Sequence, residues 1–246
     1  MKISVVIPAY NAAGCIKDAI DSCIAQTHTP HEIIVIDDAS NDDTVSIVEQ
    51  YHNVILLRQM ENKGPSAARN LGWNAASGDV IAFLDSDDTW HPKKLEVIND
   101  ILSANESILY LGHNYTVGKR AELSSVDTPK QVSYTSILIK NPYQPSCLVV
   151  RKSLDLRFNE SYRYCEDHEL SVRVAYRHHC HWLDMPLTIL GRPQLSTGGA
   201  SGNKWKMRKG ELRLYTSVWM QNPLAIIFVP ILLIFSLLKM SYRLTK

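Results

Sequence analysis

Short apolar runs alternate with stretches of helical spacing through the first part of the chain. The runs are rich in β-branched side chains and too short for helices, so they predict buried strands. We expect these strands over residues 3–7, 32–36, 54–57 and 80–84. The stretches between them carry helix-start residues and apolar positions at helical spacing, which predicts helices over residues 14–26, 42–51 and 65–76.

Strands and helices that alternate with short connections predict an α/β fold. Its central sheet should be mostly parallel, with helices on both faces. In such sheets, ligands bind at the carboxyl ends of the strands. The polar residues that follow predicted strand ends are Tyr10, Asp37, Asp38, Asp85 and Asp87. We therefore expect these side chains, which are far apart in sequence, to meet at one edge of the sheet.

The second half of the chain is less regular. Its patterns predict helices over residues 92–103 and 167–176, and strands over residues 108–112, 148–150 and 182–190. Polar or glycine-rich composition predicts loops over residues 118–131 and 194–203.

Residues 224–235 form an unbroken apolar run that contains Pro230 and has basic residues on both sides. A membrane-spanning helix needs about 20 apolar residues, which is longer than this run. A buried core helix would normally show a polar face, and this run has none. An interfacial or re-entrant membrane anchor tolerates a short, kinked apolar stretch with basic flanks. We favour this anchor over the other two interpretations.

Composition narrows the class of protein. Hydrophobic residues make up 45% and charged residues 21% of the chain, which is ordinary for a globular protein with a core. The formal net charge of +1 gives no indication of a nucleic-acid partner. Five scattered cysteines without a C-x-x-C pair favour free thiols in a reducing compartment. The amino terminus has no signal-peptide pattern, so we expect the catalytic part in the cytosol.

Three carboxylates, those of Asp85, Asp87 and Asp88, follow directly after a predicted buried strand. They repel one another unless a cation is present, and hard oxygen ligands suit Mg²⁺ or Mn²⁺. The alternative is a solvated acidic turn that caps the next helix. The expected position beside Asp38 and Tyr10 favours metal binding.

Five other residues have both a chemical and a structural interpretation. Tyr10 could stack on a base or belong to the core, and Asp38 could bind a base or ribose or cap a helix. Arg69 lies near a helix start, where it could neutralise a phosphate or belong to an ordinary capped helix. Glu166 and Asp167 precede a helix, where an acid can be a general base or an N-cap.

Some patterns argue against other classes of protein. His178, His179 and His181 fall at a helix-to-strand junction, where consecutive side chains point in different directions, so we favour a structural role over a metal cluster. The turn after the first strand has only Gly14 and no G-x-G-x-x-G, which excludes a dinucleotide-binding oxidoreductase. A glycine- and arginine-rich first loop, typical of nucleotidyltransferases, is also absent.

Together these residues resemble the family 2 glycosyltransferases, which have the GT-A fold. The resemblance covers residues 2–191 and is best between residues 4 and 90. The stretches that carry it, in the order and spacing of the family, are residues 4–11 (SVVIPAYN), 35–40 (VIDDAS), 64–70 (GPSAARN), 78–88 (GDVIAFLDSDD) and 166–167 (ED).

The resemblance implies how the nucleotide-sugar donor is bound. Pro8 and Tyr10 would contact the donor, with Tyr10 packing on its base. Asp38 would bind the same base, and Arg69 would lie near the nucleotide. Asp85 would reach the ribose.

The resemblance also implies the catalytic groups. Asp87 would hold a divalent metal, Mn²⁺ or Mg²⁺, with Asp88 as a candidate second contact. Asp167 would be the general base of the E-D motif, next to Glu166. Glu169, which follows in the same helix, is an alternative acid for this role.

The implied activity is an inverting transfer of a sugar, expected from a UDP-hexose, to a hydroxyl of a lipid-linked, lipopolysaccharide or exopolysaccharide acceptor. We expect a catalytic domain over residues 1–215, with a donor half over 1–90 and an acceptor half over 91–215. Residues 216–246 would associate with the cytoplasmic face of the membrane. The alternative is a catalytically inactive, membrane-associated partner that binds nucleotide-sugars, and the complete set of acids argues against it.

Overall fold

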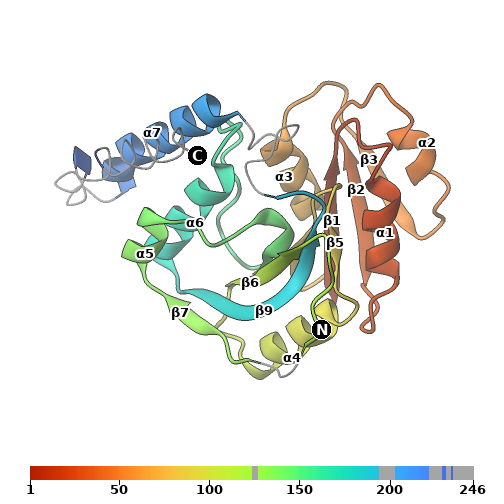
Figure 1. The fold of residues 1–246 in the computed structure, drawn as a ribbon, viewed down its shortest axis with the longest axis horizontal. Helices are drawn as coiled ribbons and strands as arrows, with labels where there is room; N and C mark the ends of the chain where they lie inside the picture. The colour runs from red at the N-terminus through yellow and green to blue at the C-terminus, as the bar shows by residue number, and fades with distance from the viewer. Residues whose placement is uncertain (124–126, 194–202, 222–228, 231–233, 235–246) are drawn as a thin grey trace.

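The computed structural model describes residues 1–123, 127–193, 203–221, 229–230 and 234. These residues form a nine-stranded sheet in the order β3-β2-β1-β4-β8-β6-β9-β5, with β7 paired to β9 (Figure 1). Helices pack on both faces of the sheet, as the alternating pattern predicted.

One half of the sheet is parallel. Its strands are β1 (Ile3–Ala9), β2 (Glu32–Asp37), β3 (Val54–Arg58) and β4 (Val80–Phe83). β1 pairs with β2 and β4, and β2 pairs with β3, all in parallel register. The parallel arrangement expected for the first strands is therefore confirmed, and all four carboxyl ends lie at one edge.

The other half of the sheet is mixed. β8 (Leu148–Arg151) joins β4 in antiparallel register, and β6 (Tyr110–Val117) joins β8 in the same way. β9 (Cys180–Leu190) then runs parallel to β6. The short strands β5 (Thr89–Trp90) and β7 (Lys130–Val132) pair with β9 in antiparallel register.

The two faces of the sheet carry separate hydrophobic clusters. In β1, Val6 belongs to one cluster and Val5 to the other, because successive side chains of a strand point to opposite faces. The cluster around Val5 includes buried residues of α1 (Ile16–Ile24) and α4 (Lys94–Ala104). The short helix α2 (Thr44–Val48) adds Val48 to this side.

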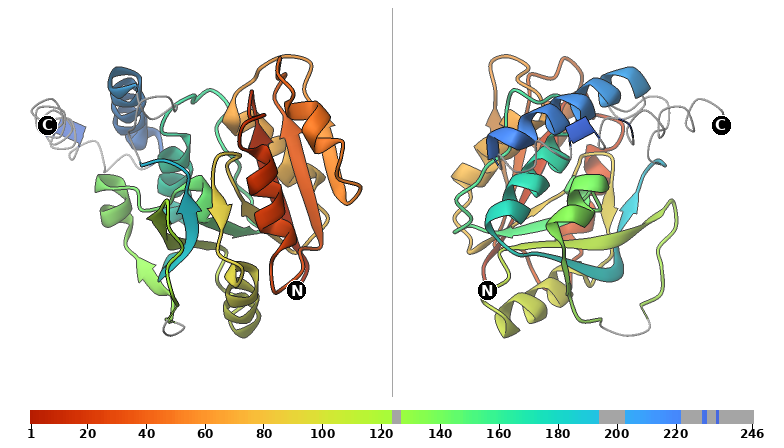
Figure 2. Two further views of the ribbon diagram at one scale, coloured as in Figure 1. Left: turned by 45° about the vertical axis from the view of Figure 1, so that its right-hand side comes forward. Right: turned by 90° about the vertical axis from the view of Figure 1, so that its left-hand side faces the viewer.

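The opposite face is covered by α3 (Pro65–Ala75), α6 (Glu166–Arg177) and the carboxyl-terminal half of α7 (Lys204–Gln221). Figure 2 shows α7 lying along the outer side of α6. α3 approaches the sheet closely at Gly72, where an added Cβ would lie 2.5 Å from side-chain atoms of Val6 and Ile36. A glycine at this position therefore lets α3 sit against the strands whose ends form the site.

Local patterns missed several elements of the second half, namely β5, β7, α7, α5 (Tyr134–Ile139) and the 3₁₀ turn η1 (Pro145–Cys147). β5 and β7 are two and three residues long, and both are ordered by pairing with β9. Such pairing is a long-range contact that no short window of sequence records.

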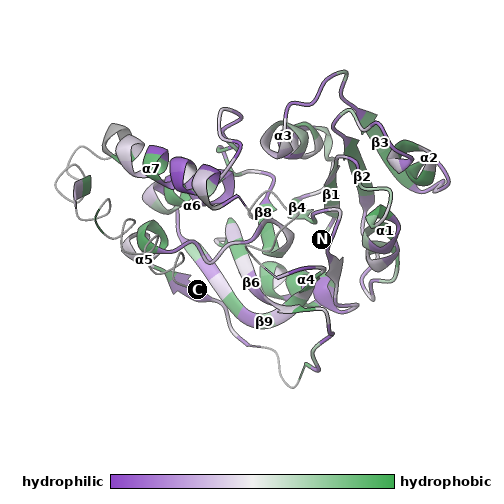
Figure 3. Cartoon of the chain, turned by 45° about the horizontal axis from the view of Figure 1, so that its top comes forward, coloured by the Kyte–Doolittle hydropathy of each residue, from purple (hydrophilic) through white to green (hydrophobic). Residues whose placement is uncertain are grey.

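The expected boundary at residue 215 falls inside α7. The apolar run over residues 224–235 lies almost entirely outside the described residues, so the membrane anchor stays a prediction. Among the described helices, none combines the length and the apolar character needed to cross a bilayer. Figure 3 shows that hydrophilic and hydrophobic positions alternate along α7.

Candidate active site

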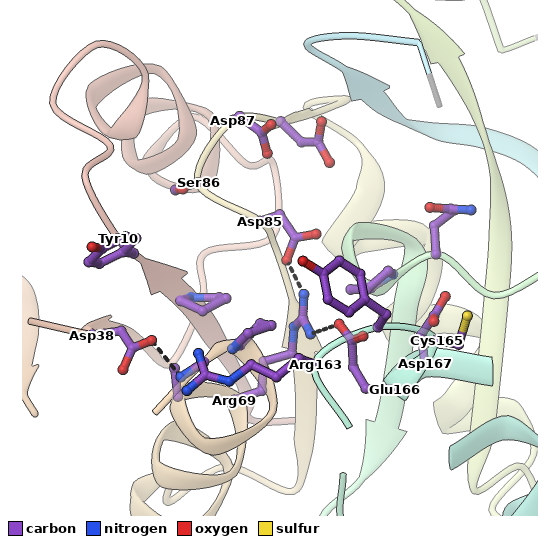
Figure 4. Close-up of a pocket in the computed structure, with 18 of the residues that line it drawn as sticks. Tyr10, Asp38, Arg69, Asp85, Ser86, Asp87, Arg163, Cys165, Glu166 and Asp167 are labelled. Carbon is purple, nitrogen blue, oxygen red and sulfur yellow. Dashed lines mark hydrogen bonds and ion pairs between the residues drawn. The ribbon is translucent and has the colours of Figure 1, made fainter. Parts of the chain in front are cut away.

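A cleft of about 860 Å³ opens at the carboxyl edge of the parallel strands. Its walls come from the loops after β1, β2 and β4, the start of α3, the start of α6 and one side of α7. The residues predicted for the site that line this cleft are Pro8, Tyr10, Asp38, Arg69, Asp85, Asp87, Asp88, Glu166 and Asp167. Of the five side chains named by the edge-of-sheet prediction, Tyr10, Asp38, Asp85 and Asp87 line the cleft (Figure 4), whereas Asp37 is buried and does not line it.

Tyr10 and Asp38 lie on the wall formed by β1 and β2. Tyr10 is 49% exposed, so its ring faces the cleft and is not part of the core. The two loops that carry these residues are tied together, because the Asn11 amide donates to Ser40 Oγ and the Asn41 amide donates to Asn11 Oδ1.

The Asp38 carboxylate is buried and holds the loop that leads into α3. It accepts hydrogen bonds from the backbone amides of Lys63 and Gly64, both at 2.8 Å, and from Gln59 Nε2 at 2.9 Å. These bonds fix the carboxylate at the cleft wall. They leave acceptor capacity for one further donor, because a carboxylate offers about four acceptor positions.

Arg69 joins the two acidic motifs across the floor of the cleft. Its guanidinium pairs with Asp85 Oδ1 at 2.6 Å and with Glu166 Oε1 at 3.0 Å (Figure 4). Burial disfavours the charged guanidinium, but these two carboxylates outweigh it and raise the pKa of Arg69. Partial burial raises the pKa of Asp85, and the Arg69 charge opposes that effect. Arg69 is therefore a permanent cation that links α3, the end of β4 and α6.

Asp167 faces the cleft from the first turn of α6 and is not used in that ion-pair network. Its Oδ2 accepts a hydrogen bond from Asn141 Nδ2 at 2.8 Å. Burial, and then the negative charge of Glu166, raise the pKa of Asp167 to about 7. A carboxyl group with this pKa can take up and release a proton near neutral pH.

Glu169, the alternative acid, is in a different environment. It is buried, it does not line the cleft, and its two carboxylate oxygens pair with Arg173 at 2.6 and 2.7 Å. It is therefore not placed to receive a proton from a substrate in the cleft.

The three acids of the turn after β4 have different partners. Asp87 is about one third exposed and pairs with the Arg192 guanidinium, whose Nε lies 2.8 Å from Oδ2. Asp88 is buried, and burial followed by the charge of Asp85 raises its pKa to about 7. Asp87 thus presents its carboxylate to the cleft, whereas Asp88 turns into the protein.

The residues at this turn fit a divalent ion of the Mg²⁺ or Mn²⁺ type. Such ions commonly use one or two protein carboxylates and complete their shell with water and substrate phosphates. Asp87, with Asp85 nearby, offers hard oxygen donors of this kind. No group of three or more His, Cys, Asp or Glu side chains suited to a metal occurs among the described residues. A metal here would therefore depend on oxygen atoms from a ligand.

Two of the three histidines at the helix-to-strand junction have other side-chain partners. His178 Nε2 lies 2.9 Å from Asp155 Oδ1, and His179 Nδ1 lies 2.7 Å from Gln131 Nε2. Neither histidine lines the cleft.

Sequence reasoning missed two arginines of the cleft, Arg163 and Arg192. Arg163 donates to Asn62 Oδ1 at 2.8 Å, and Asn62 in turn donates to the carbonyl oxygen of Asp38. Arg192 lies just after the end of β9, and β9 runs parallel to β6. A search of every predicted strand end, rather than only the first four, would have found Arg192.

The chain resembles proteins of known class over most of its length. A family model described as Glycosyl transferase family 2 matches residues 4–148. The Escherichia coli UDP-Glc:alpha-D-GlcNAc-diphosphoundecaprenol beta-1,3-glucosyltransferase WfgD is 30% identical over 229 residues, which are 92% of this chain and 89% of that protein. The putative teichuronic acid biosynthesis glycosyltransferase TuaG of Bacillus subtilis (strain 168) is 42% identical over 100 residues, which are 38% of this chain and 39% of TuaG.

The fold also matches that of S. aureus TarS, solved in complex with UDP-GlcNAc. The TM-score is 0.71 at 21% sequence identity, and the match covers 89% of this chain and 67% of that one. At this level of identity the likeness supports the α/β, GT-A-like fold alone.

The fold places an acid-lined cleft at the carboxyl edge of the sheet, where α/β proteins bind their ligands. The chain belongs to glycosyl transferase family 2 and is a glycosyltransferase of that family.

Proposed function

We propose that this glycosyltransferase moves a hexose from a UDP-sugar to a hydroxyl of a lipid-linked or other surface-polysaccharide acceptor, with inversion at the sugar carbon. The observation that carries this proposal is one cleft in which Arg69 joins the acidic turn to the E-D motif. Arg69 forms ion pairs with Asp85 and Glu166, and Asp167, which also lines the cleft, is the acid proposed to contact the acceptor.

The donor is proposed to lie along the wall formed by β1, β2 and α3. The exposed ring of Tyr10 is suited to stack on a base, and Pro8 lines the same wall. Asp38, fixed by the amides of the Lys63–Gly64 loop, is suited to accept a hydrogen bond from the base. Asp85 is held by Arg69 at the place where we expect the ribose.

Asp87 is proposed to hold a divalent ion together with the diphosphate of the donor. When bound, such an ion stabilises the negative charge that develops on the departing nucleoside diphosphate. In the described structure the Asp87 carboxylate pairs with Arg192, whose charge can also interact with a diphosphate.

Asp167 is proposed to be the general base. The acceptor hydroxyl would donate its proton to Asp167 while its oxygen attacks the sugar carbon from the face opposite the diphosphate. The new glycosidic bond forms as the bond to the diphosphate breaks, which inverts the configuration at that carbon. General base catalysis of this kind contributes about 10²–10⁴-fold.

The acceptor side is proposed from two observations. The relative WfgD is described as acting on a diphosphoundecaprenol-linked sugar, and TuaG is associated with teichuronic acid biosynthesis. The apolar run over residues 224–235 suits a place at the cytoplasmic face of a membrane, where lipid-linked acceptors lie. We accordingly propose a catalytic unit over residues 1–215 and a membrane-associating segment over residues 216–246.

The donor can be identified by nucleoside diphosphate release from UDP-, GDP- and dTDP-sugars, measured with Mn²⁺ or Mg²⁺ and then with EDTA. We expect metal-dependent release from a UDP-hexose in the presence of a lipid-diphosphate sugar acceptor. Asp167→Asn should bind UDP like the wild type and lose transfer by at least about 10²-fold. Normal transfer by Asp167→Asn would refute the assignment of the base.

The alternative function is an inactive partner that binds nucleotide-sugars. It predicts UDP-sugar binding by calorimetry without release from any donor, even with acceptor and metal at saturation. The raised pKa of Asp167 and its position in the cleft favour the enzyme.

A further inference from the structure

Asp88 differs from its neighbours in the acidic turn because both of its carboxylate oxygens are already used inside the protein. The side chain is buried, with the residue 8% exposed. Oδ2 accepts a hydrogen bond from Ser146 Oγ at 2.5 Å, and Oδ1 accepts one from the Gly191 backbone amide at 3.0 Å. Each oxygen of this carboxylate therefore has a hydrogen-bond partner inside the protein, at a residue that borders the cleft.

Ser146, in η1, connects this carboxylate to the rest of the turn. Its hydroxyl donates to Asp88 and accepts from the Asp85 backbone amide at 3.0 Å. The residue is 1% exposed, so water does not compete for these bonds. One hydroxyl thus spans the turn from its first acid to its last.

The backbone of Ser146 is itself held by three donors beneath the turn. Its carbonyl oxygen accepts from Lys94 Nζ at 2.8 Å, Thr188 Oγ1 at 2.8 Å and Trp90 Nε1 at 3.0 Å. The Lys94 ammonium is fully buried and lies 3.7 Å from the centroid of the Trp90 ring. These contacts come from α4, β5 and β9, so Ser146 cannot shift without disturbing three elements.

The end of β9 closes the turn from the other side. An added Cβ on Gly191 would lie 2.1 Å from the carbonyl oxygen of Asp87, so the two backbones are in direct contact. The Gly191 amide donates to Asp88, and the next residue, Arg192, pairs with Asp87. Asp88 therefore sets the distance between the acidic turn and the strand end that carries Arg192.

We propose that Asp88 and Ser146 are positioning residues that clamp the acidic turn between η1 and the end of β9, and that Asp88 is not a ligand of the divalent ion. The clamp orients Asp85 and Asp87 toward the donor, and this part of the inference rests on the proposed function. Partners that orient metal ligands in this way commonly contribute 10–100-fold to metal affinity.

The test compares Asp88→Asn with Asp88→Ala. Asparagine keeps an oxygen for the Gly191 amide and an amide group that can donate to Ser146 Oγ, but it removes the negative charge. Alanine removes both bonds. If Asp88 positions the turn, Asp88→Asn should bind Mn²⁺ with UDP within about threefold of the wild type, and Asp88→Ala should lose about 10–100-fold.

Ser146→Ala and Asp87→Asn are the matched variants. Ser146→Ala should weaken Mn²⁺ binding about as much as Asp88→Ala, because it breaks the same clamp. Asp87→Asn should lose Mn²⁺ binding altogether. Binding is measured by the electron paramagnetic resonance signal of free Mn²⁺ on the full chain, with near-ultraviolet circular dichroism to check that each variant is folded.

Two results would overturn the proposal. If Asp88→Asn loses Mn²⁺ binding to the same extent as Asp87→Asn, then Asp88 is a ligand of the ion. If Asp88→Ala binds Mn²⁺ like the wild type, then the acidic turn does not depend on the clamp. Hydrogen exchange gives a readout independent of metal and donor: Asp88→Ala should expose the Gly191 amide, and Ser146→Ala the Asp85 amide. If the wild type binds no Mn²⁺ with UDP, the proposed function fails. The clamp is then decided by exchange at these two amides alone.

Discussion

Ala39 adopts a left-handed backbone conformation, with φ of 63°, directly after Asp38. For a residue with a Cβ this conformation costs about 1–2 kcal/mol. The loop accepts that cost because the turn directs Asp38 toward the backbone amides that precede α3. A residue that contacts no substrate thus helps to set the wall on which we expect the base to lie.

Ala39→Gly should therefore stabilise the protein. The relief of strain exceeds the added entropy of the unfolded chain, and we expect a gain of about 0.5–1 kcal/mol in the free energy of unfolding. Urea denaturation measures the change. The matched control is Ala25→Gly, at an ordinary φ of −79°, which should destabilise by about 0.5–1 kcal/mol. A loss of stability in Ala39→Gly would show that the left-handed turn is not strained.

The raised pKa of Asp167 leads to a pH dependence of activity. A base must be deprotonated to act, so kcat/KM should rise with pH through about 7 and level off above it. Asn141 donates a hydrogen bond that favours the charged carboxylate. Asn141→Ala should therefore move the acidic limb of the profile to higher pH, and initial rates between pH 5 and 9 measure it. A limb that stays in place would argue that another group is titrating.

The raised pKa of Asp167 also affects the stability of the fold, which should fall as pH rises, whereas activity should increase. The folded state favours the protonated form of an acid whose pKa lies above its ordinary value of 3.8, so the contribution of that acid to stability falls as pH rises from about 4 to 7. This cost is one reason why a base of this kind occurs only where function requires it.

At the scale of elements, Arg69 makes α3 part of the site's framework. Its buried guanidinium is the shared partner of Asp85, after β4, and Glu166, in α6.

Arg69→Met would leave two poorly hydrated carboxylates without their cation. We expect a loss of about 3–5 kcal/mol in the free energy of unfolding, measured in guanidinium chloride. Lys17→Met removes an exposed ion pair with Asp21 in α1 and should produce no measurable change. Equal effects of the two substitutions would contradict this role of Arg69.

The elements of the parallel half could be predicted because each has a clear pattern within its own stretch of sequence. β4 is a continuous apolar run, and β1 is apolar apart from Ser4. Asp38, Asp85 and Asp87 follow strand ends that the α/β pattern places at one edge. What could not be predicted depends on contacts between distant residues. Nothing near Ser146 in sequence indicates that its hydroxyl reaches Asp85 and Asp88, and its role required the fold.

The same reasoning explains why the three acids of the turn were not distinguished by sequence. A run of carboxylates indicates a site but not the direction of each side chain. Arg192 pairs with Asp87, and Gly191 donates to Asp88, because β9 ends beside the turn. That neighbour is more than one hundred residues away in the chain, as the separations of 103 and 105 residues show.

At the scale of the whole molecule, α7 runs from the cleft into the segment over residues 216–246 that we propose associates with the membrane. Met207 and Glu211 line the cleft from one side of α7. Trp205 is 67% exposed, and Lys206 and Lys209 are exposed beside it. An exposed tryptophan among lysines suits the interface of an anionic bilayer. Binding through this side would bring the mouth of the cleft near a lipid-linked acceptor.

This orientation can be tested with the full chain and vesicles that contain anionic phospholipid. The double variant Lys206→Glu with Lys209→Glu should lower binding in a sedimentation assay by at least about tenfold, because each basic residue near such a surface contributes about 1 kcal/mol. The control is the double variant Lys2→Glu with Lys93→Glu, which makes the same change in charge at the amino terminus and just before α4. Figure 1 shows the amino terminus and α4 at the bottom of the view and α7 at its top. Its binding should match the wild type.

If both double variants bind equally, net charge rather than α7 governs association, and the orientation is wrong. If only the α7 variant is weakened, and it also loses transfer to a lipid-linked acceptor but keeps transfer to a soluble one, then α7 presents the cleft to the membrane.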